Sequence, residues 1–266
     1  MMMTQVLNGF LLSSLITMVA LRRGSLSPSG GVGALIVGTM TFGFGGWAWG
    51  SLLGVFFVTS SLLSHFKEEE KAAVAEKFDK GHERDLGQAL ANGGVGSAAA
   101  LLAVVWPEGW WYAFFIGVMG TVNADTWATE LGTLSRRRPR LITTGKQVEV
   151  GTSGGISVLG TVVSLVGGAV IGLFGGWLGP YGLVAGVVMG AVGGLAGSLF
   201  DSLLGATVQA NYYCEACGKE TEKVVHGCGT ATRQVRGWVW LNNDMVNLAA
   251  SVVGGLVAVG VWGVWG

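Results

Sequence analysis

The sequence predicts an all-α integral membrane protein with about eight transmembrane helices. Hydrophobic residues make up 50% of the 266 residues, whereas charged residues make up only 12%. A soluble protein carries about 25% charged residues. Apolar runs of roughly 17–25 residues, the length that crosses a bilayer, recur along the whole chain. The 47 glycines suit helices that pack closely in a membrane, so we expect one polytopic membrane domain over residues 1–266.

Eight apolar segments are candidates for the spanning helices, and the glycine-rich turn at Gly45-Gly46 separates the second from the third. The first segment lacks a basic start and a small-residue cleavage site, so we take it as a retained helix rather than a signal peptide. The candidates are Val6–Leu21, Gly30–Gly45, Gly46–Ser64, Ala89–Trp106, Trp110–Leu134, Gly154–Trp177, Tyr181–Gly205 and Met245–Trp265.

The basic residues fall on one side of these helices. All 16 Lys and Arg residues follow the first, third, fifth or seventh candidate, and a wrong helix count would have scattered them. The positive-inside rule makes that side the cytoplasm, which predicts a multi-pass protein of the cell (inner) membrane with its N- and C-termini outside. The opposite loops are short and contain the interfacial residues Trp106–Trp110 and Gly179–Tyr181. On the basic side, segment 67–84 is taken as a solvated linker, with a short helix or lid as the alternative.

Three glycine motifs each open an even-numbered candidate helix. They are Ser29-Gly30-Gly31, Asn92-Gly93-Gly94 and Ser153-Gly154-Gly155, and their first glycines are 63 and 61 residues apart. This spacing indicates possible parallel two-helix repeats. A helix N-terminus with free N–H groups binds anions, glycine lets phosphate approach the backbone, and the Ser and Asn residues suit N-caps. Ordinary capping and close helix packing explain a single motif better, but three motifs on one face, beside intramembrane carboxylates, favour phosphate binding.

Carboxylates lie at the cytoplasmic ends of two predicted helices. Asp125 and Glu130 follow the apolar run Trp110–Val122 without a loop signal, and Asp201 ends the seventh candidate. Asp125 and Glu130 are about 140° apart around an ideal helix, so a metal ion shared with Asp125 needs a broken helix or Asp201 from the second helix. Mg²⁺ prefers such oxygen ligands. We predict a catalytic magnesium site of Asp125, Asp201 and Glu130; pairing with the Arg136–Arg138 cluster or an interfacial position is the alternative.

Polar residues near these carboxylates are candidates for binding a nucleotide cofactor. Arg140 and Lys146, in the loop after the fifth helix, could reach its phosphates. A basic run in this place is more often a topogenic signal or a contact with anionic lipid. Thr144-Gly145-Lys146 is not a Walker A motif, because the upstream glycine is missing. The binding candidates are Asn92, Gly93, Gly94, Thr126, Arg140, Lys146, Ser153, Gly154, Gly155, Ser202, Asn243 and Asp244.

Residues 206–243 are predicted to form a small cytoplasmic insert. Cys214 and Cys217 have C-x₂-C spacing, and His226 and Cys228 follow after a gap of eight residues. Four soft ligands predict a zinc knuckle with a structural Zn²⁺, although the second half is tighter than usual. Free thiols or partial occupancy are the alternative. A thioredoxin-like redox role is not indicated, because no βαβ pattern surrounds the C-x₂-C pair.

Several motifs, in conserved order from about Asp85 to the C-terminus, resemble one known family of membrane proteins. On these motifs the chain is identified as a member of the family labelled domain of unknown function 92, which includes transmembrane protein nineteen and the plant phytyl-phosphate kinase. The cysteine cluster is not universal in that family. The motifs are Asp85–Gly94, Ala124–Gly132, Pro139–Thr144, Gly151–Ser157, Gly197–Gln209 and Asn243–Asn247.

The resemblance implies a membrane kinase that phosphorylates an isoprenoid monophosphate, of the phytyl or geranylgeranyl phosphate type, to the diphosphate. It implies CTP as the phosphate donor and Mg²⁺ as the metal, with the active site on the cytoplasmic side. The expected partners are the isoprenoid phosphate, the nucleotide and the lipid bilayer, with no nucleic acid. One alternative is a CTP-dependent lipid-phosphate cytidylyltransferase, which would release pyrophosphate from the same site. Another is a secondary transporter using intramembrane carboxylates, which predicts acidic residues nearer the midplane.

Overall fold

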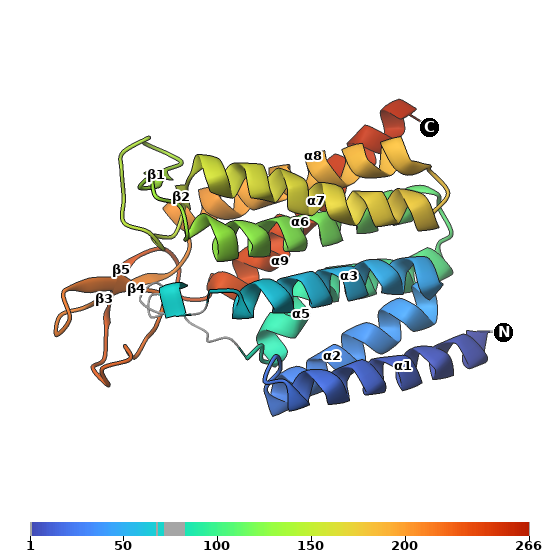
Figure 1. The fold of residues 1–266 in the computed structure, drawn as a ribbon, viewed down its shortest axis with the longest axis horizontal. Helices are drawn as coiled ribbons and strands as arrows, with labels where there is room; N and C mark the ends of the chain where they lie inside the picture. The colour runs from blue at the N-terminus through green and yellow to red at the C-terminus, as the bar shows by residue number, and fades with distance from the viewer. Residues whose placement is uncertain (1, 68, 72–82, 266) are drawn as a thin grey trace.

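Figure 1 shows the computed structural model, which describes residues 2–67, 69–71 and 83–265. Long helices lie side by side, with both chain termini at one end of the bundle and the short β-strands at the other. The helices are α1 (Met2–Arg22), α2 (Pro28–Met40), α3 (Gly46–His65), α5 (Leu86–Val105), α6 (Trp110–Gly132), α7 (Val158–Leu178), α8 (Leu183–Thr207) and α9 (Asn243–Trp265).

The helices are those of an integral membrane protein, which confirms the predicted class. Among the described residues, six helical segments are long and apolar enough to cross a membrane. They are α1, the segment Pro28–His65 that holds both α2 and α3, α5, α7, α8 and α9. Helix α6 is 23 residues long but is not among them, and it carries the polar residues Asn123, Asp125 and Glu130. The number of spans and the side of the termini stay predictions.

The chain reverses between α2 and α3 at the predicted glycine pair. A π-helical turn, η1 (Thr41–Gly45), follows α2, and α3 begins at Gly46. Gly46 has a φ of 80°, a left-handed conformation that a residue with a Cβ rarely adopts. The glycine therefore permits the reversal, and Figure 1 shows α2 and α3 running in opposite directions from it.

Helix α6 is the centre of the bundle. Every residue from Trp111 to Ala124 is buried, and α3, α5, α7, α8 and α9 all contact this helix. Phe115 is fully buried, and Trp49 of α3 packs against it with 4.4 Å between ring centroids. Asp125 follows directly on this buried run, so the packing of α6 sets its position.

Glycines let α7 and α8 approach backbone to backbone. Gly168, Gly172 and Gly176 recur at every fourth residue of α7, as Gly186 and Gly190 do on α8. A Cβ built at Gly172 would collide with the carbonyl oxygen of Gly186, and one at Gly168 with that of Gly190. This small-xxx-small packing is typical of membrane helices and accounts for part of the glycine excess.

Only the first of the three glycine motifs lies at the start of a helix, which corrects the sequence prediction. The N-caps of α2, α5 and α7 are Ser27, Asp85 and Ser157, each of which accepts a hydrogen bond from the backbone of the first turn. Pro28 after Ser27, and Gln88 in a capping box with Asp85, fix these starts. The predicted caps that the structure does not support are Ser29, Asn92 and Ser153.

The glycines of these motifs serve close packing instead. A Cβ at Gly30 would collide with the carbonyl oxygen of Arg84, and one at Gly93 with Val37. Gly30 lies in the first turn of α2, Gly93 in the interior of α5, and Gly154 before α7. Because the motifs occupy different positions relative to their helices, they give no support to the two-helix repeat.

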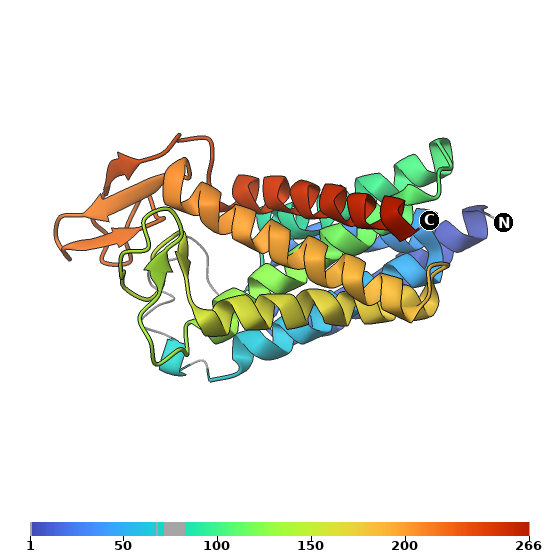
Figure 2. The same ribbon diagram turned by 90° about the horizontal axis from the view of Figure 1, so that it is seen from above.

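The insert folds as a small antiparallel sheet beyond the ends of the helices (Figure 2). Its central strand β3 (Asn211–Cys214) pairs with β4 (Lys219–Thr221) and β5 (Arg233–Arg236). A two-stranded sheet of β1 (Arg140–Leu141) and β2 (Gly155–Ile156) lies at the same end. The basic residues that the structure describes also lie at this end, away from the termini.

Candidate functional site

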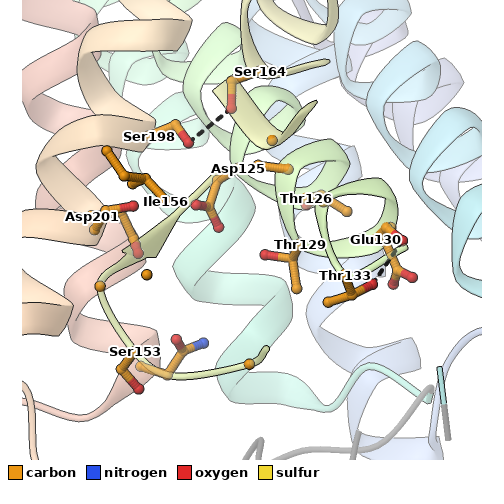
Figure 3. Close-up of a pocket in the computed structure, with 18 of the residues that line it drawn as sticks. Asp125, Thr126, Thr129, Glu130, Thr133, Ser153, Ile156, Ser164, Ser198 and Asp201 are labelled. Atoms are coloured by element: carbon orange, nitrogen blue, oxygen red, sulfur yellow. Dashed lines mark hydrogen bonds between the residues drawn. The ribbon is translucent and has the colours of Figure 1, made fainter. Parts of the chain in front are cut away.

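A polar cavity of about 310 Å³ lies at the basic end, where α6 and α8 end and α7 and α9 begin. Its wall is completed by α5, by loop 150–157 and by residues Gln209 and Glu222 of the insert. Figure 3 shows that carboxylate and hydroxyl side chains from several of these elements point into one space. Such a wall suits a charged and strongly hydrated ligand.

Asp125 of α6 and Asp201 of α8 face each other across this cavity (Figure 3). The two carboxylates repel each other electrostatically, and Glu222 adds to the repulsion. Asp201 Oδ2 is buried and has no hydrogen-bond partner among the described residues. Because a buried polar atom without a partner is costly, this pair of carboxylates fits a bound cation.

Two serines lie beside Asp125. Ser198 of α8 is near enough to the Asp125 carboxyl group to interact with it electrostatically. Ser164 Oγ of α7 lies 3.2 Å from Ser198 Oγ and donates to the carbonyl oxygen of Ala124 at 3.4 Å. These hydroxyl groups connect α6, α7 and α8 at the depth of the carboxylates, so the pair is held by three helices.

Glu222 reaches the cavity from the insert, directly after β4. Its Oε1 accepts hydrogen bonds from Ser153 Oγ at 2.9 Å and from Gln209 Nε2 at 2.8 Å. Asn211 Nδ2 donates to Ser153 Oγ at 3.4 Å. Ser153 therefore holds a carboxylate of the insert, and Glu222 is the third acidic residue near Asp125 and Asp201.

Glu130 lies on the side of the cavity away from Asp201 (Figure 3). The buried Lys71 Nζ forms an ion pair with Glu130 Oε2, and Ser64 Oγ donates to Oε1 at 2.9 Å. In the part of the chain that the structure describes, no three carboxylates have oxygens within 4.8 Å of one another. The predicted role of Glu130 as a third metal ligand is therefore not supported, because the helix turns it away from Asp125 and Lys71 neutralises it.

The backbone of Arg84 is fixed against the loop between α1 and α2. Arg84 N donates to the carbonyl oxygen of Ser25 at 3.2 Å, and Ser27 N donates to that of Arg84 at 3.0 Å. Gly30 packs so closely on the same carbonyl group that no Cβ fits there. The side chain of Arg84 is thus directed by a rigid anchor, although the sequence predicts a solvated linker here.

The Arg84 guanidinium brings a cation to the cavity wall. It lies over the rings of Phe56 and Phe57, at 5.6 and 5.8 Å from their centroids, and Nη1 donates to Ser61 Oγ at 3.2 Å. Burial lowers the pKa of Arg84 below its ordinary value, and the charge of Glu130 opposes this shift. Within the described ranges no carboxylate forms an ion pair with Arg84.

Comparison with known proteins assigns the chain to a family. A family model described as integral membrane protein DUF92 matches residues 11–255. The chain belongs to the DUF92 family.

Relatives of this DUF92 protein occur in plants and archaea. Protein PGR of Arabidopsis thaliana is 35% identical over 90% of each chain. An uncharacterized membrane protein of Methanocaldococcus jannaschii is 32% identical over 88% of this chain and 84% of its own. Protein VTE6, chloroplastic, of Arabidopsis thaliana is 28% identical over 88% of this chain and 64% of its own. No solved structure matches the chain.

Most of the predicted site residues of the DUF92 protein line the same cavity, although they come from four helices and a loop. This agrees with the prediction that the ends of these helices meet. The predicted residues in the cavity wall are Asn92, Asp125, Thr126, Glu130, Ser153, Gly154, Gly155, Asp201, Ser202 and Asn243.

Arg140 and Lys146 are predicted to contact phosphate, but both lie outside the cavity wall, in β1 and in the loop that follows it. Arg140 is exposed, and its Nη1 donates to the carbonyl oxygen of Gly145 at 2.8 Å. Lys146 is exposed in the same loop, while the buried Pro139 faces the cavity. Arg140 is therefore held by its own loop, outside the cavity.

Three further predicted residues also lie outside the wall: Gly93, Gly94 and Asp244. Both glycines are within α5, where Gly93 packs against α2. Asp244 is on another face of α9 from Asn243, whereas Asn247, four residues after Asn243, does line the cavity. Because residues four apart lie on the same face of a helix, Asn247 could have been predicted together with Asn243.

Lys71, Arg84 and Glu222 are wall residues that the sequence prediction missed. Arg84 precedes the helix cap Asp85, which is a weak local signal. Lys71 and Glu222 lie in polar segments without periodicity, and nothing in the sequence distinguishes them from solvated charges.

The four predicted zinc ligands also lie close together. They form a second cluster, which is in the insert and separate from the polar cavity. The ligand atoms of Cys214, Cys217, His226 and Cys228 all lie within 4.8 Å of one another. The three cysteines are free thiols. Hydrogen bonds with Thr230 and then with His226 lower the pKa of Cys228 to about 6, so this thiol readily supplies the thiolate that a metal ion needs.

Proposed function

We propose that this DUF92 protein is a membrane kinase that phosphorylates an isoprenoid monophosphate, of the phytyl or geranylgeranyl type, with CTP as the donor. The observation that carries the proposal is the pair Asp125 and Asp201. These carboxylates face each other from adjacent membrane helices, and Arg84 lies in the same wall. Carboxylates that hold a metal ion and a cation that meets a phosphate are the parts that phosphoryl transfer requires.

The residues fit a magnesium ion. Mg²⁺ is usually held by one or two carboxylates together with phosphate oxygens and water. Asp125 and Asp201 supply two carboxylates, and Asp201 Oδ2 has no hydrogen-bond partner in the described part of the chain. When bound there, Mg²⁺ would neutralise charge on the donor phosphates. Glu130, which Lys71 neutralises, is left out of this metal site.

The reaction depends on positioning rather than on a strong base. An oxygen of the acceptor phosphate attacks the terminal phosphorus of the nucleotide. A new P–O bond forms while the bond from that phosphorus to its bridging oxygen breaks, and the nucleoside diphosphate leaves with the electron pair. The acceptor phosphate is ionised near neutral pH, so no side chain has to remove a proton. Arg84 would bind the acceptor phosphate, and the loop Ser153–Gly155 would bind the donor.

Membership of the family supports a lipid substrate. The sequence motifs resemble the family that includes the plant phytyl-phosphate kinase, and the chain belongs to that family. The cavity lies at the basic end of the bundle, which the positive-inside rule assigns to the cytoplasm. We therefore place the active site on the cytoplasmic side of the cell (inner) membrane.

The burial of α6 at the centre of the bundle argues against a transporter. A transport pathway needs polar residues along a route through the bundle, whereas α6 is buried from Trp111 to Ala124 and fills its centre with apolar side chains. A cytidylyltransferase would use the same carboxylates but would release pyrophosphate, so the products of the reaction separate it from a kinase.

Asp125→Asn and Asp201→Asn test the proposed function. Each variant should lose at least about 100-fold in turnover of phytyl phosphate with CTP and Mg²⁺, because each removes a charge that acts on the transferring group. Elution from size-exclusion chromatography in detergent should be unchanged. Glu108→Gln is the matched control, since Glu108 is an exposed carboxylate far from the cavity, at the opposite end of the bundle. Wild-type turnover in either Asp variant would overturn the assignment.

A further inference from the structure

Two turns of the insert bring four soft ligands to one point. The turn Cys214–Gly218 joins β3 to β4, and the turn His226–Gly229 precedes β5. In each turn the final glycine has a left-handed φ, 64° and 82°, and donates its N–H to the carbonyl group of the first ligand at 2.8 Å. Both turns therefore curl their ligand side chains inward by the same backbone device.

Two distances between ligand atoms are close to those expected at a zinc site. Two sulfurs bonded to one tetrahedral Zn²⁺ at about 2.3 Å lie about 3.8 Å apart, and a sulfur and a nitrogen lie about 3.6 Å apart. Cys214 Sγ and Cys228 Sγ are 3.7 Å apart, and His226 Nδ1 and Cys228 Sγ are 3.3 Å apart. The burial of Cys214 and His226 gives the cluster a dry inner side.

The β3–β4 hairpin connects this cluster to the polar cavity. Cys214 pairs with Lys219 at the cluster end, and Tyr212 pairs with Thr221 at the cavity end. Glu222 follows directly on Thr221 and accepts hydrogen bonds in the cavity wall. We propose that Cys214, Cys217, His226 and Cys228 bind one structural Zn²⁺, which fixes this hairpin and thereby positions Glu222.

Elemental analysis of the purified full-length protein, prepared without a polyhistidine tag, tests the metal site. We expect about one zinc per chain. Cys217→Ser should lose most of the zinc while remaining folded, because Cys217 is exposed. Glu215→Gln, an exposed change in the same turn, is the control and should keep its zinc. A protein that takes up no zinc, or that contains a Cys214–Cys228 disulfide by mass spectrometry, would overturn the proposal.

Hydrogen exchange tests the positioning role separately from metal content. Removing zinc with a chelator should speed exchange at the amides of residues 219–222 and leave those of α7 and α8 unchanged. If zinc stabilised only the two turns, its removal would speed exchange only at the amides of residues 214–218 and 226–229. In that case the link to Glu222 would be wrong even though zinc binds.

A second observation concerns an apolar groove between α1, α2, α3 and α5. A cavity of about 70 Å³ lies there, and its wall is almost wholly apolar, with Ile16, Val37 and Phe56 among the lining residues. Its polar end is formed by Arg84, Gln88 and Asn92, which also line the polar cavity. The two cavities thus share one wall, and the Arg84 guanidinium lies in it.

This junction fits a ligand with an anionic head and a hydrocarbon chain. Arg84 rests on the rings of Phe56 and Phe57, so the cation and the apolar lining touch each other. We infer, resting on the proposed function, that the groove holds the first part of the isoprenoid chain while Arg84 binds the acceptor phosphate. The remainder of the chain would lie in the bilayer.

Gly54 offers a sharp test of the groove. It lines the groove, and a Cβ built on it meets no atom within 4 Å, so Gly54→Leu would fill the groove without a backbone clash. Gly260→Leu is the control, because a Cβ at Gly260 also meets no atom within 4 Å and Gly260 lines neither cavity. We expect Gly54→Leu to lower kcat/KM for geranylgeranyl phosphate roughly 10-fold or more and to spare a five-carbon prenyl phosphate.

The outcomes separate the groove from the kinase activity. If wild-type protein phosphorylates no prenyl phosphate, the proposed function fails. If it is active and Gly54→Leu leaves the preference for chain length unchanged, only the groove inference fails. An equal loss for both chain lengths also contradicts it, and would fit a groove occupied by a membrane lipid.

Discussion

The C-terminal helices α7 and α8 and the N-terminal helices α1 to α3 are packed in different ways. Between α7 and α8, glycines such as Gly172 and Gly186 meet backbone to backbone, and no Cβ fits. Between α1 and α2, Gly38 packs against the side chain of Ser13, and an apolar groove remains between these helices, α3 and α5. Asp201 therefore lies in the half of the molecule where helices meet backbone to backbone, which we call the tight half, whereas the space for an apolar ligand lies in the half that contains α1 to α3. The polar cavity is where the two halves meet.

The largest effect is expected from a side chain in the tight half. Gly172→Leu should destabilise the protein by more than about 3 kcal/mol, because the new side chain would force α7 and α8 apart along their whole contact. Gly260→Leu, on α9 where a Cβ meets no atom within 4 Å, should leave stability nearly unchanged. Thermal unfolding in detergent measures both variants. Equal stability of the two would mean that the glycine contacts between α7 and α8 do not hold the fold.

A smaller effect is expected where the halves join. Arg84→Ala should raise KM for the prenyl phosphate and lower kcat/KM by roughly 10–100-fold, the worth of a charge-assisted hydrogen bond. Arg140→Ala is the control, because the exposed Arg140 donates to its own loop. Steady-state kinetics at varied acceptor concentration distinguish the two variants. A larger loss in Arg140→Ala than in Arg84→Ala would restore the phosphate site that the sequence predicts.

The helices and the carboxylate pair could be predicted because each depends on simple periodicities. The apolar lengths place the helices, and the turn at Gly46 divides α2 from α3 as expected. Asp125 and Asp201 lie near the ends of the fifth and the seventh predicted helices, which leave the membrane on the same side, so both residues are expected at the same face. The angle around α6 likewise separates Asp125 from Glu130 (Figure 3).

The partners of those carboxylates could not be predicted. Lys71 and Glu222 lie in polar segments outside the long helices. Such segments have no periodic pattern of apolar residues, so the sequence does not indicate which of their side chains face the cavity. The glycine motifs were ambiguous for another reason. A glycine that lets phosphate approach a backbone also lets a second backbone approach, and only its neighbours decide between the two, as Arg84 does for Gly30.

The fate of the terminal phosphate of CTP tests the central claim most directly. Purified protein in detergent is incubated with γ-labelled CTP, Mg²⁺ and phytyl phosphate, and the lipid and nucleotide products are separated. A kinase built on Asp125 and Asp201 transfers the label to the lipid and forms one CDP for each labelled diphosphate. Label released in pyrophosphate, with CMP joined to the lipid, would contradict the account and make the protein a cytidylyltransferase.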